Sequence, residues 1–184
     1  MLRPLQMAHA FLAEVVSKED TVVDATMGNG HDTLFLAQLA RQVYAFDIQE
    51  QAVEKTRQRL AEAGLDNVQL ILVGHETLDQ YTDHFKAAIF NLGYLPSADK
   101  SVITRPDTTL EALEKVCRGL EKGGRAAIMI YYGHELLNQM LQITIYRLIF
   151  DKNLGKIAVI TNLSTKRNVH ISRSRFGLHS KIIT

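Results

Sequence analysis

The sequence contains little of several features, and each shortage excludes a class of protein. Of its 184 residues only Cys117 is a cysteine, so no disulfide forms within the chain and no cysteine-based metal site is expected. Three prolines and no low-complexity tract argue against a long disordered linker. No apolar run approaches the roughly 18 residues that a membrane span needs, and Met1–Pro4 does not begin a signal peptide. We therefore expect one cytoplasmic domain over residues 1–184, with no metal and no membrane contact.

Charge is divided unevenly along the chain, although the net charge is only +1. Residues 147–184 hold eight Lys or Arg against one acid, whereas residues 1–146 hold thirteen against nineteen. A basic end on an acidic body is typical of contact with a polyanion such as RNA, and a solvated basic surface gives the same pattern. A binding assay over a range of salt concentrations distinguishes these two interpretations.

Apolar strand-like runs alternate with amphipathic helix-like runs up to about residue 132. The expected strands cover 21–25, 43–46, 68–73, 87–92 and 125–132, and the expected helices cover 5–16, 31–41, 49–63, 78–84 and 106–120. The last part is less regular: 143–150 and 156–161 are candidate strands, and 176–183 is left unassigned. Strands that alternate with helices of this length imply right-handed βαβ units. The predicted fold is therefore α/β and Rossmann-like, a mostly parallel twisted sheet with helices on both faces.

The stretch DATMGNGHDT, residues 24–33, follows the first expected strand, where a doubly wound sheet binds its ligand. A nicotinamide-binding loop reads G-x-G-x-x-G, and the third glycine is missing after Gly28 and Gly30. The spacing fits better the loop of S-adenosylmethionine-dependent methyltransferases, in which an acid precedes small residues at two, four and six positions further on, here Asp24, Thr26, Gly28 and Gly30. The glycines are expected to let the backbone approach the ligand, and Asp24 suits its ammonium group, directly or through water.

Polar residues at three further strand ends suit the same cofactor. Asp47 ends the second strand, where a carboxylate accepts both ribose hydroxyls or caps the next helix. His75 and Glu76 follow the third strand, where they contact adenine or cap a short helix. Residues 91–94 (NLGY) resemble the N-P-P-Y motif of methyltransferases that act on amino nitrogens, with leucine and glycine in place of the prolines. The asparagine would aim the lone pair of a neutral amine and Tyr94 would stack on a base, unless these residues form an ordinary turn.

Taken together, DATMGNGHDT, AFDIQ, the Gly74-His75-Glu76 turn, NLGYLPSADK and YYGHE resemble the YtqB-like family of rRNA methylases. Its members are better described as tRNA 5-aminomethyluridine methyltransferases of the MnmM type. The resemblance covers residues 1 to about 135 and implies a class I methyltransferase fold with S-adenosylmethionine as methyl donor. It also implies methylation of the exocyclic amine on the wobble uridine of tRNA. After Glu135 the chain departs from the family pattern, so the resemblance does not extend to the basic end.

The motifs and the resemblance together assign site residues. The cofactor would be bound at the ends of the first four strands, by Asp24, Thr26, Met27, Gly28, Asn29, Gly30, His31, Asp32, Asp47, Ile48, Gln49, His75, Glu76, Asn91 and Leu92. The substrate would be contacted by Tyr94, Asp99, Thr104, Thr108, Thr109 and His134. Asn91 and Tyr94 would be the catalytic residues. The general base stays open among His31, His75, His134 and Tyr94.

Other functions stay open on the sequence. An rRNA base methyltransferase and a small-molecule N-methyltransferase use the same motifs, and a non-catalytic S-adenosylmethionine-binding module would keep the loop without the chemistry. A nicotinamide-dependent oxidoreductase would explain the glycines and Asp47, but neither the missing third glycine nor the turn at 91–94. RNA is the expected partner, with tRNA preferred over rRNA. The oligomeric state is undecided, with a homodimer as one option.

Overall fold

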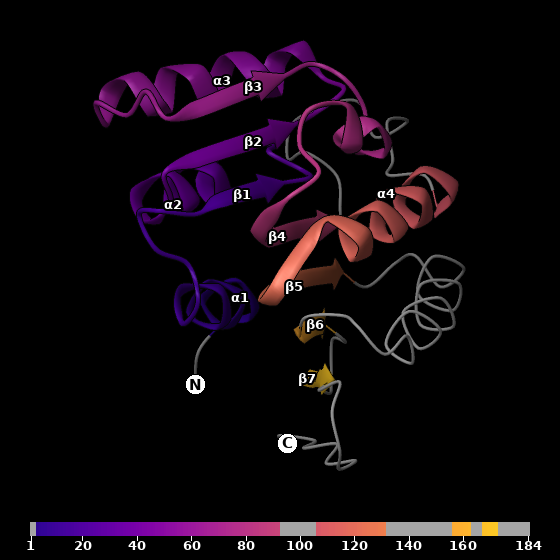
Figure 1. The fold of residues 1–184 in the computed structure, drawn as a ribbon. Coiled ribbons are helices and arrows are strands. Elements are labelled where there is room, and N and C mark those ends of the chain that lie inside the picture. Colours follow the sequence, from indigo (N-terminus) through magenta and orange to yellow (C-terminus); the bar gives the residue numbers. More distant parts are fainter. Residues whose placement is uncertain (1–2, 93–105, 132–155, 163–166, 173–184) are drawn as a thin grey trace.

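A computed structural model describes residues 3–92, 106–131, 156–162 and 167–172 of the chain. The strands in these residues are β1 (Thr21–Asp24), β2 (Gln42–Phe46), β3 (Val68–Ile71), β4 (Phe85–Leu92), β5 (Leu120–Tyr131), β6 (Lys156–Asn162) and β7 (Arg167–Ser172). They form one sheet in the order β3-β2-β1-β4-β5-β6-β7 (Figure 1). Neighbouring strands from β3 to β6 run parallel, and β7 runs antiparallel to β6 at the edge.

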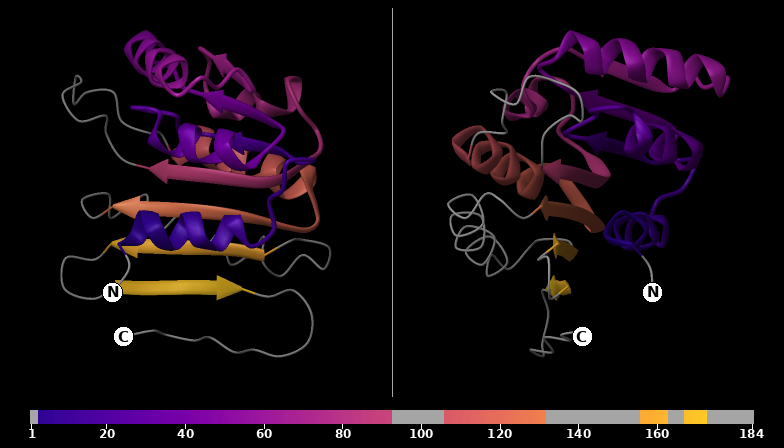
Figure 2. Two further views of the ribbon diagram at one scale, coloured as in Figure 1. Left: turned by 90° about the vertical axis from the view of Figure 1, so that its left-hand side faces the viewer. Right: turned by 180° about the vertical axis from the view of Figure 1, so that it is seen from behind.

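Helices cover both faces of this sheet. They are α1 (Pro4–Ala13), α2 (His31–Leu39), α3 (Glu50–Glu62) and α4 (Pro106–Gly119), together with the 3₁₀-helix η1 (His75–Gln80). The first three helices pack on one face, and η1 and α4 pack on the other (Figure 2). The α/β, Rossmann-like fold predicted from the sequence is confirmed. None of the helices in the described part is long and apolar enough to cross a membrane.

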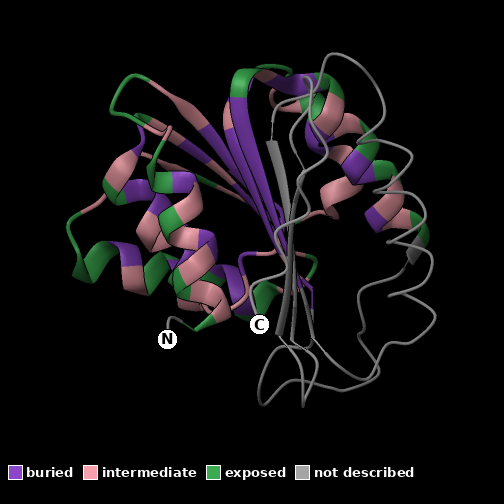
Figure 3. Ribbon diagram, turned by 90° about the horizontal axis from the view of Figure 1, so that it is seen from below, coloured by how far each residue is buried: buried purple, intermediate pink, exposed green. Residues whose placement is uncertain are grey.

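The central strands are apolar along their whole length because both of their faces are buried. On β4, Ala87 and Ile89 pack with the layer of α1, α2 and α3, whereas Ala88 and Phe90 pack with η1 and α4. Figure 3 shows these strands as a buried band between the helical layers. The two-sided burial fixes the register, so the polar residues that follow each strand meet at one edge of the sheet.

The amino-terminal helix α1 is tied to β5, far along the chain. Arg125 on β5 is buried; its Nη1 donates to the carbonyl oxygen of Phe11 at 2.6 Å and pairs with Glu14, also at 2.6 Å. Its guanidinium lies 4.6 Å from the centre of the Phe11 ring. α1 also packs against β6, across the front of the left-hand view in Figure 2. These contacts hold α1 over the sheet and thereby fix the position of His9.

Some element boundaries differ from those expected. The short helix expected at 78–84 is the 3₁₀-helix η1, which begins earlier because both the amide and the hydroxyl of Thr77 donate to the carbonyl oxygen of Gly74. The expected strand at 156–161 is present as β6, and the sequence did not predict β7. The regions 143–150 and 176–183 lie outside the described residues.

Candidate functional site

The order of the strands places a switch point between β1 and β4. The chain moves outward from β1 to β2 and β3, then returns to place β4 on the other side of β1. In such sheets the ligand binds beyond the carboxyl ends of the strands at this point. Hydrogen bonds join the ends of β1 and β4 directly. The backbone N–H of Asn91 donates to Thr26 Oγ1 at 2.7 Å, and the backbone N–H of Ala25 donates to the carbonyl oxygen of Ile89 at 3.0 Å.

Asp24, at the end of β1, is completely buried. It lies beneath the glycine loop, residues 25–30, which joins β1 to α2. Its carboxylate accepts hydrogen bonds from the Thr26 amide at 3.1 Å and from the Thr33 hydroxyl at 2.6 Å. Burial, with the nearby charge of Asp32, raises the pKa of Asp24 to about 7, although the two hydrogen bonds oppose the shift. We expected a contact with the ligand's ammonium directly or through water, and because this side chain has no accessible surface, the direct contact does not fit the structure.

Gly30 has a structural role that the sequence did not reveal. Its φ of +77° is in the left-handed region, where it ends the loop and precedes the first residue of α2. A Cβ at this position would stand 2.7 Å from Thr56 Oγ1 and 3.0 Å from the Thr56 Cα on α3. The glycine is therefore required by the packing of the loop on α3, and the ligand is not needed to explain it.

Asp47, after β2, is fixed by the backbone and stays partly accessible. It accepts from the Gly28 amide at 3.0 Å and from the Gln49 amide at 2.9 Å. Burial raises its pKa above the ordinary value, while these hydrogen bonds lower it. Ile48 beside it is 61% exposed, and Leu72 after β3 is 48% exposed. A held carboxylate beside two exposed apolar side chains suits a ribose and a flat base.

His75 connects three elements near this edge. Because a carbonyl oxygen only accepts, Nδ1 carries the proton and donates to the Ala25 carbonyl oxygen at 3.0 Å. Its Nε2 lies 3.5 Å from the hydroxyl of Thr109 on α4, and its ring meets Phe90 edge-on. Burial lowers the pKa of His75, so the neutral ring is favoured. His75 thus links β1 to α4.

A chain of three side chains joins α1, α2 and β4. Asp32, buried at the start of α2, accepts from His9 Nε2 at 2.6 Å through Oδ1 and from Asn91 Nδ2 at 3.0 Å through Oδ2. The His9 ring also stacks on Phe35, with centroids 3.8 Å apart. Sequence reasoning missed His9, because a single histidine within LQMAHAFLA reads as part of an amphipathic helix. The one hint was a polar ring on a helix otherwise rich in apolar residues.

The other predicted site residues fall into four groups. Met27 and Leu92 are buried in the core, so their side chains do not line the site. The Glu76 carboxylate fills the space that a side chain at Gly74 would occupy, and the Glu76 carbonyl oxygen accepts from Lys115; no side chain caps η1 by a hydrogen bond. Thr108 and Thr109 are on α4, whereas Tyr94, Asp99, Thr104 and His134 lie outside the described residues. Among the described residues, no group of His, Cys, Asp or Glu is arranged to hold a metal ion.

Comparison with known proteins assigns the chain to a protein family. The family model described as "Putative rRNA methylase" matches residues 43–147, more than half of the sequence. The chain belongs to this family. An rRNA methylase from Streptococcus thermophilus, known from its crystal structure, is 63% identical in sequence. Its TM-score is 0.64, over 73% of this chain and 74% of that one.

Two further relatives are named as methyltransferases. The crystal structure of SMU.1697c from Streptococcus mutans, solved in complex with SAH, is 44% identical, with a TM-score of 0.81 over 94% of this chain and 96% of that one. The chloroplastic tRNA (mnm(5)s(2)U34)-methyltransferase of Arabidopsis thaliana is 38% identical over 144 residues. That alignment covers 70% of this chain and 53% of the plant protein, so the chain spans about half the length of this relative.

Proposed function

We propose that the protein transfers a methyl group from S-adenosylmethionine to RNA, and that its substrate is the 5-aminomethyl group of the wobble uridine in tRNA. The family membership and the relative solved with SAH support a methyltransferase that uses S-adenosylmethionine. The name of the plant relative supports the wobble uridine. The observation that carries the choice of an amine is the contact between Asn91 and Asp32.

The described residues fit the proposed cofactor. Asp47 would accept the ribose hydroxyls with the oxygen lone pairs that Gly28 and Gln49 leave available. The exposed Ile48 would lie against the adenine. Asn29 Oδ1 is buried and has no hydrogen-bond partner among the described residues, and a ligand ammonium or hydroxyl is the kind of donor that it lacks. When bound, the cofactor supplies a reactive methyl group on a positively charged sulfur.

Asp32 determines which end of the Asn91 amide is available to the substrate. A carboxylate oxygen accepts hydrogen bonds, so the group that Asn91 presents to Asp32 is its NH₂. The amide oxygen of Asn91 is then the end that remains as an acceptor for an amine hydrogen. Accepting that hydrogen orients the nitrogen lone pair, which is what an in-line displacement at the methyl group requires. A hydroxyl or ring-carbon nucleophile has less use for this arrangement.

His9 positions this pair. Its Nε2 donates to the second oxygen of Asp32, and its stack on Phe35 fixes the plane of the ring. With one oxygen held by His9, Asp32 turns the other toward Asn91. His9 would therefore act through Asp32 as a positioning residue rather than by touching the reacting atoms.

A nicotinamide cofactor fits the loop less well. The third glycine of a dinucleotide loop would stand at Thr33, whose buried hydroxyl instead binds Asp24. Asp32 is one residue earlier, in the first turn of α2, where a pyrophosphate would otherwise sit. A carboxylate at that position repels a diphosphate.

The deciding experiment is nucleoside mass spectrometry of tRNA from cells that lack the protein. We expect 5-aminomethyluridine derivatives to accumulate at the wobble position and the methylaminomethyl product to disappear. Purified protein should then restore the methyl group from labelled S-adenosylmethionine. Unchanged tRNA, with a methyl group missing from rRNA instead, would replace the proposal by an rRNA methyltransferase. Calorimetric binding of NAD without binding of S-adenosylmethionine would point to an oxidoreductase.

A further inference from the structure

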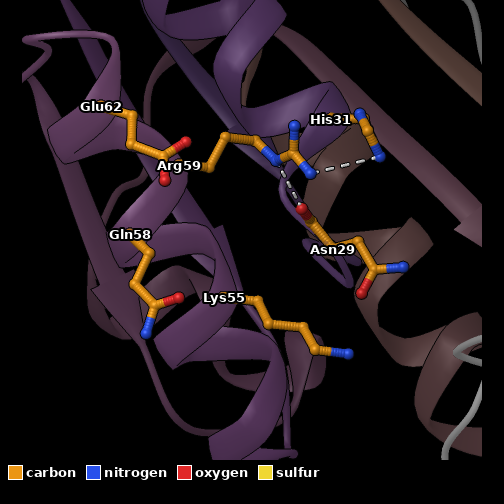
Figure 4. Close-up of a pocket in the computed structure, with 6 residues that line it drawn as sticks. All are labelled: Asn29, His31, Lys55, Gln58, Arg59 and Glu62. Carbon is orange, nitrogen blue, oxygen red and sulfur yellow. Dashed lines mark hydrogen bonds between the residues drawn. The ribbon is translucent and has the colours of Figure 1, made fainter.

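A polar hollow lies between the glycine loop and α3 (Figure 4). It has a volume of about 330 Å³ and is lined by Asn29, His31, Lys55, Gln58, Arg59 and Glu62. Four of these side chains come from α3, at a spacing of three and four residues that places them along one side of the helix. The sequence motifs assign no function to α3.

The hollow is on the opposite side of the glycine loop from Asp47. The Gly28 amide donates to Asp47 at 3.0 Å, so this side of the loop faces the proposed ribose site. The loop carbonyls instead face α3: Gly28 accepts from the Thr56 hydroxyl at 3.3 Å, and Asn29 accepts from Arg59 Nε at 2.9 Å. The cofactor site and the hollow therefore share the loop and meet at Asn29.

The hollow favours an anion. Arg59 is held by the Asn29 carbonyl oxygen and also lies 3.5 Å from His31 Nε2, so its guanidinium is largely ordered in advance. Lys55 makes no ion pair within the described residues, and its ammonium lies toward Asn29 in Figure 4. Of the six lining residues, Glu62 alone is acidic. His31 is the first residue of α2, where the helix dipole adds partial positive charge.

We propose that this hollow binds a backbone phosphate of the RNA substrate, close to the nucleotide that is methylated. The inference rests on the proposed function. Guanidinium and ammonium groups are the usual side-chain donors to phosphate, and an Arg held in place loses little further freedom on binding. His31 lines the hollow, and the next residue, Asp32, binds Asn91. One RNA strand can therefore reach both the hollow and the amine-orienting residue around the start of α2.

The test measures RNA affinity and its salt dependence for three variants. Lys55→Glu reverses a charge in the hollow, and Glu62→Gln removes the acid from it. Lys122→Glu is the matched control, because Lys122 is exposed near the start of β5, at the opposite edge of the sheet. Arg59 is left unchanged, since it also supports the loop. Fluorescence anisotropy with an unmodified tRNA transcript gives the affinity over a series of salt concentrations, and calorimetry gives the affinity for S-adenosylmethionine.

We expect Lys55→Glu to weaken RNA binding roughly tenfold and to flatten the plot of log affinity against log salt by about 0.7–1 unit, the contribution of one phosphate contact. Glu62→Gln should tighten binding, and Lys122→Glu should leave it near wild type. The cofactor affinity of all three should be unchanged. Equal losses in the Lys55 and Lys122 variants, or a loss of cofactor affinity in place of RNA affinity, would overturn the phosphate site. If the wild-type protein itself binds no RNA, the proposed function fails as well.

Discussion

Two histidines reach the switch point from opposite faces of the sheet, and they differ in their partners. His9 comes from the layer of α1 and α2 and donates to a carboxylate, Asp32. His75 comes from the layer of η1 and α4; it donates to a carbonyl oxygen and lies near a hydroxyl. Burial lowers the pKa of His75, although the charges of Glu76 and Asp47 oppose the shift, and the two groups that its ring nitrogens contact are neutral.

The difference separates two tasks at one edge of the sheet. On the face that carries His9, the contacts lead through Asp32 to Asn91, so the acidic Asp32 controls which atoms of Asn91 meet the nucleophile. The face that carries His75 holds β1 against α4 with neutral groups. We infer that changes on the first face reduce turnover, whereas changes on the second reduce stability. The predictions below test this division.

The largest expected effect is at Asn91. Asn91→Ala removes the acceptor that would orient the amine, and we expect turnover to fall about 10²–10⁴-fold, the range for one positioned polar group. Affinity for S-adenosylmethionine should change by less than about 1 kcal/mol, near the net contribution of one neutral hydrogen bond. Methyl transfer to undermodified tRNA and calorimetry on the same variant give both values. Turnover within a few-fold of wild type would exclude the amine-orienting role.

Asp47 should show the reverse pattern, with an effect on binding. Asp47→Ala should weaken S-adenosylmethionine binding by about 1.5–3 kcal/mol, because hydrogen bonds to a charged group are lost. Gly28 and Gln49 also lose an acceptor, so circular dichroism and thermal unfolding must first establish that the variant is folded. A folded variant with unchanged affinity in calorimetry would remove Asp47 from the ribose site.

Paired substitutions at the two histidines compare the faces directly. His9→Leu removes the donor to Asp32, and we expect kcat to fall about 10–100-fold, the equivalent of one hydrogen bond to a charged group, with little change in cofactor affinity. His9→Gln keeps an N–H donor and should recover much of the loss. His75→Leu should lower the melting temperature and leave kcat closer to wild type. Equal losses of kcat in both leucine variants, without rescue by Gln, would contradict the division of tasks.

The last prediction concerns the pH dependence of stability. The folded-state pKa of Asp24, about 7, lies above the ordinary value of 3.8, so the folded protein binds this proton more tightly than the unfolded chain. The stability that Asp24 contributes is present below about pH 4 and is lost as the pH rises through about 7. Asp24→Asn should therefore flatten the fall in the free energy of unfolding between these values. Chemical denaturation of both proteins at several pH values measures the difference, and parallel curves would show that Asp24 titrates normally.

The sequence predicted those strands and strand ends that follow from the local pattern of apolar residues. The run of Thr21–Ala25 and the acids after β1 and β2 placed the loop and Asp47 correctly, because strand ends follow from apolar runs. The pattern could not show that Gly30 packs on Thr56, since that contact joins residues 26 positions apart. The partnership of His9 with Asp32 was hidden for the same reason.

The misplaced boundaries also have physical causes. η1 begins at His75 because Thr77 bonds back to Gly74, a local competition that apolar periodicity does not register. β5 begins at Leu120, before the glycines expected to separate it from α4, because Leu120 pairs with Phe85 across an irregularity in the ladder. Asp24 was assigned to the ligand because its type and position fit, and the pattern could not show that its side chain would be fully buried.

The attachment of α1 to β5 has a consequence for the order in which the site assembles. The contact between Arg125 and Phe11 joins residues 114 positions apart, so it closes one of the longest loops in the chain. Such contacts form late, because the entropy of closing the loop is lost before they stabilise anything. During synthesis, α2 and its Phe35 are available to His9 early, but α1 lacks its contacts with β5 until that strand emerges. The contacts of Asn91 with Thr26 and Asp32 need no residue of β5, whereas the anchoring of His9 does. A chain that stops before β5 therefore has its glycine loop and Asn91 but lacks the anchor that holds His9 against Asp32.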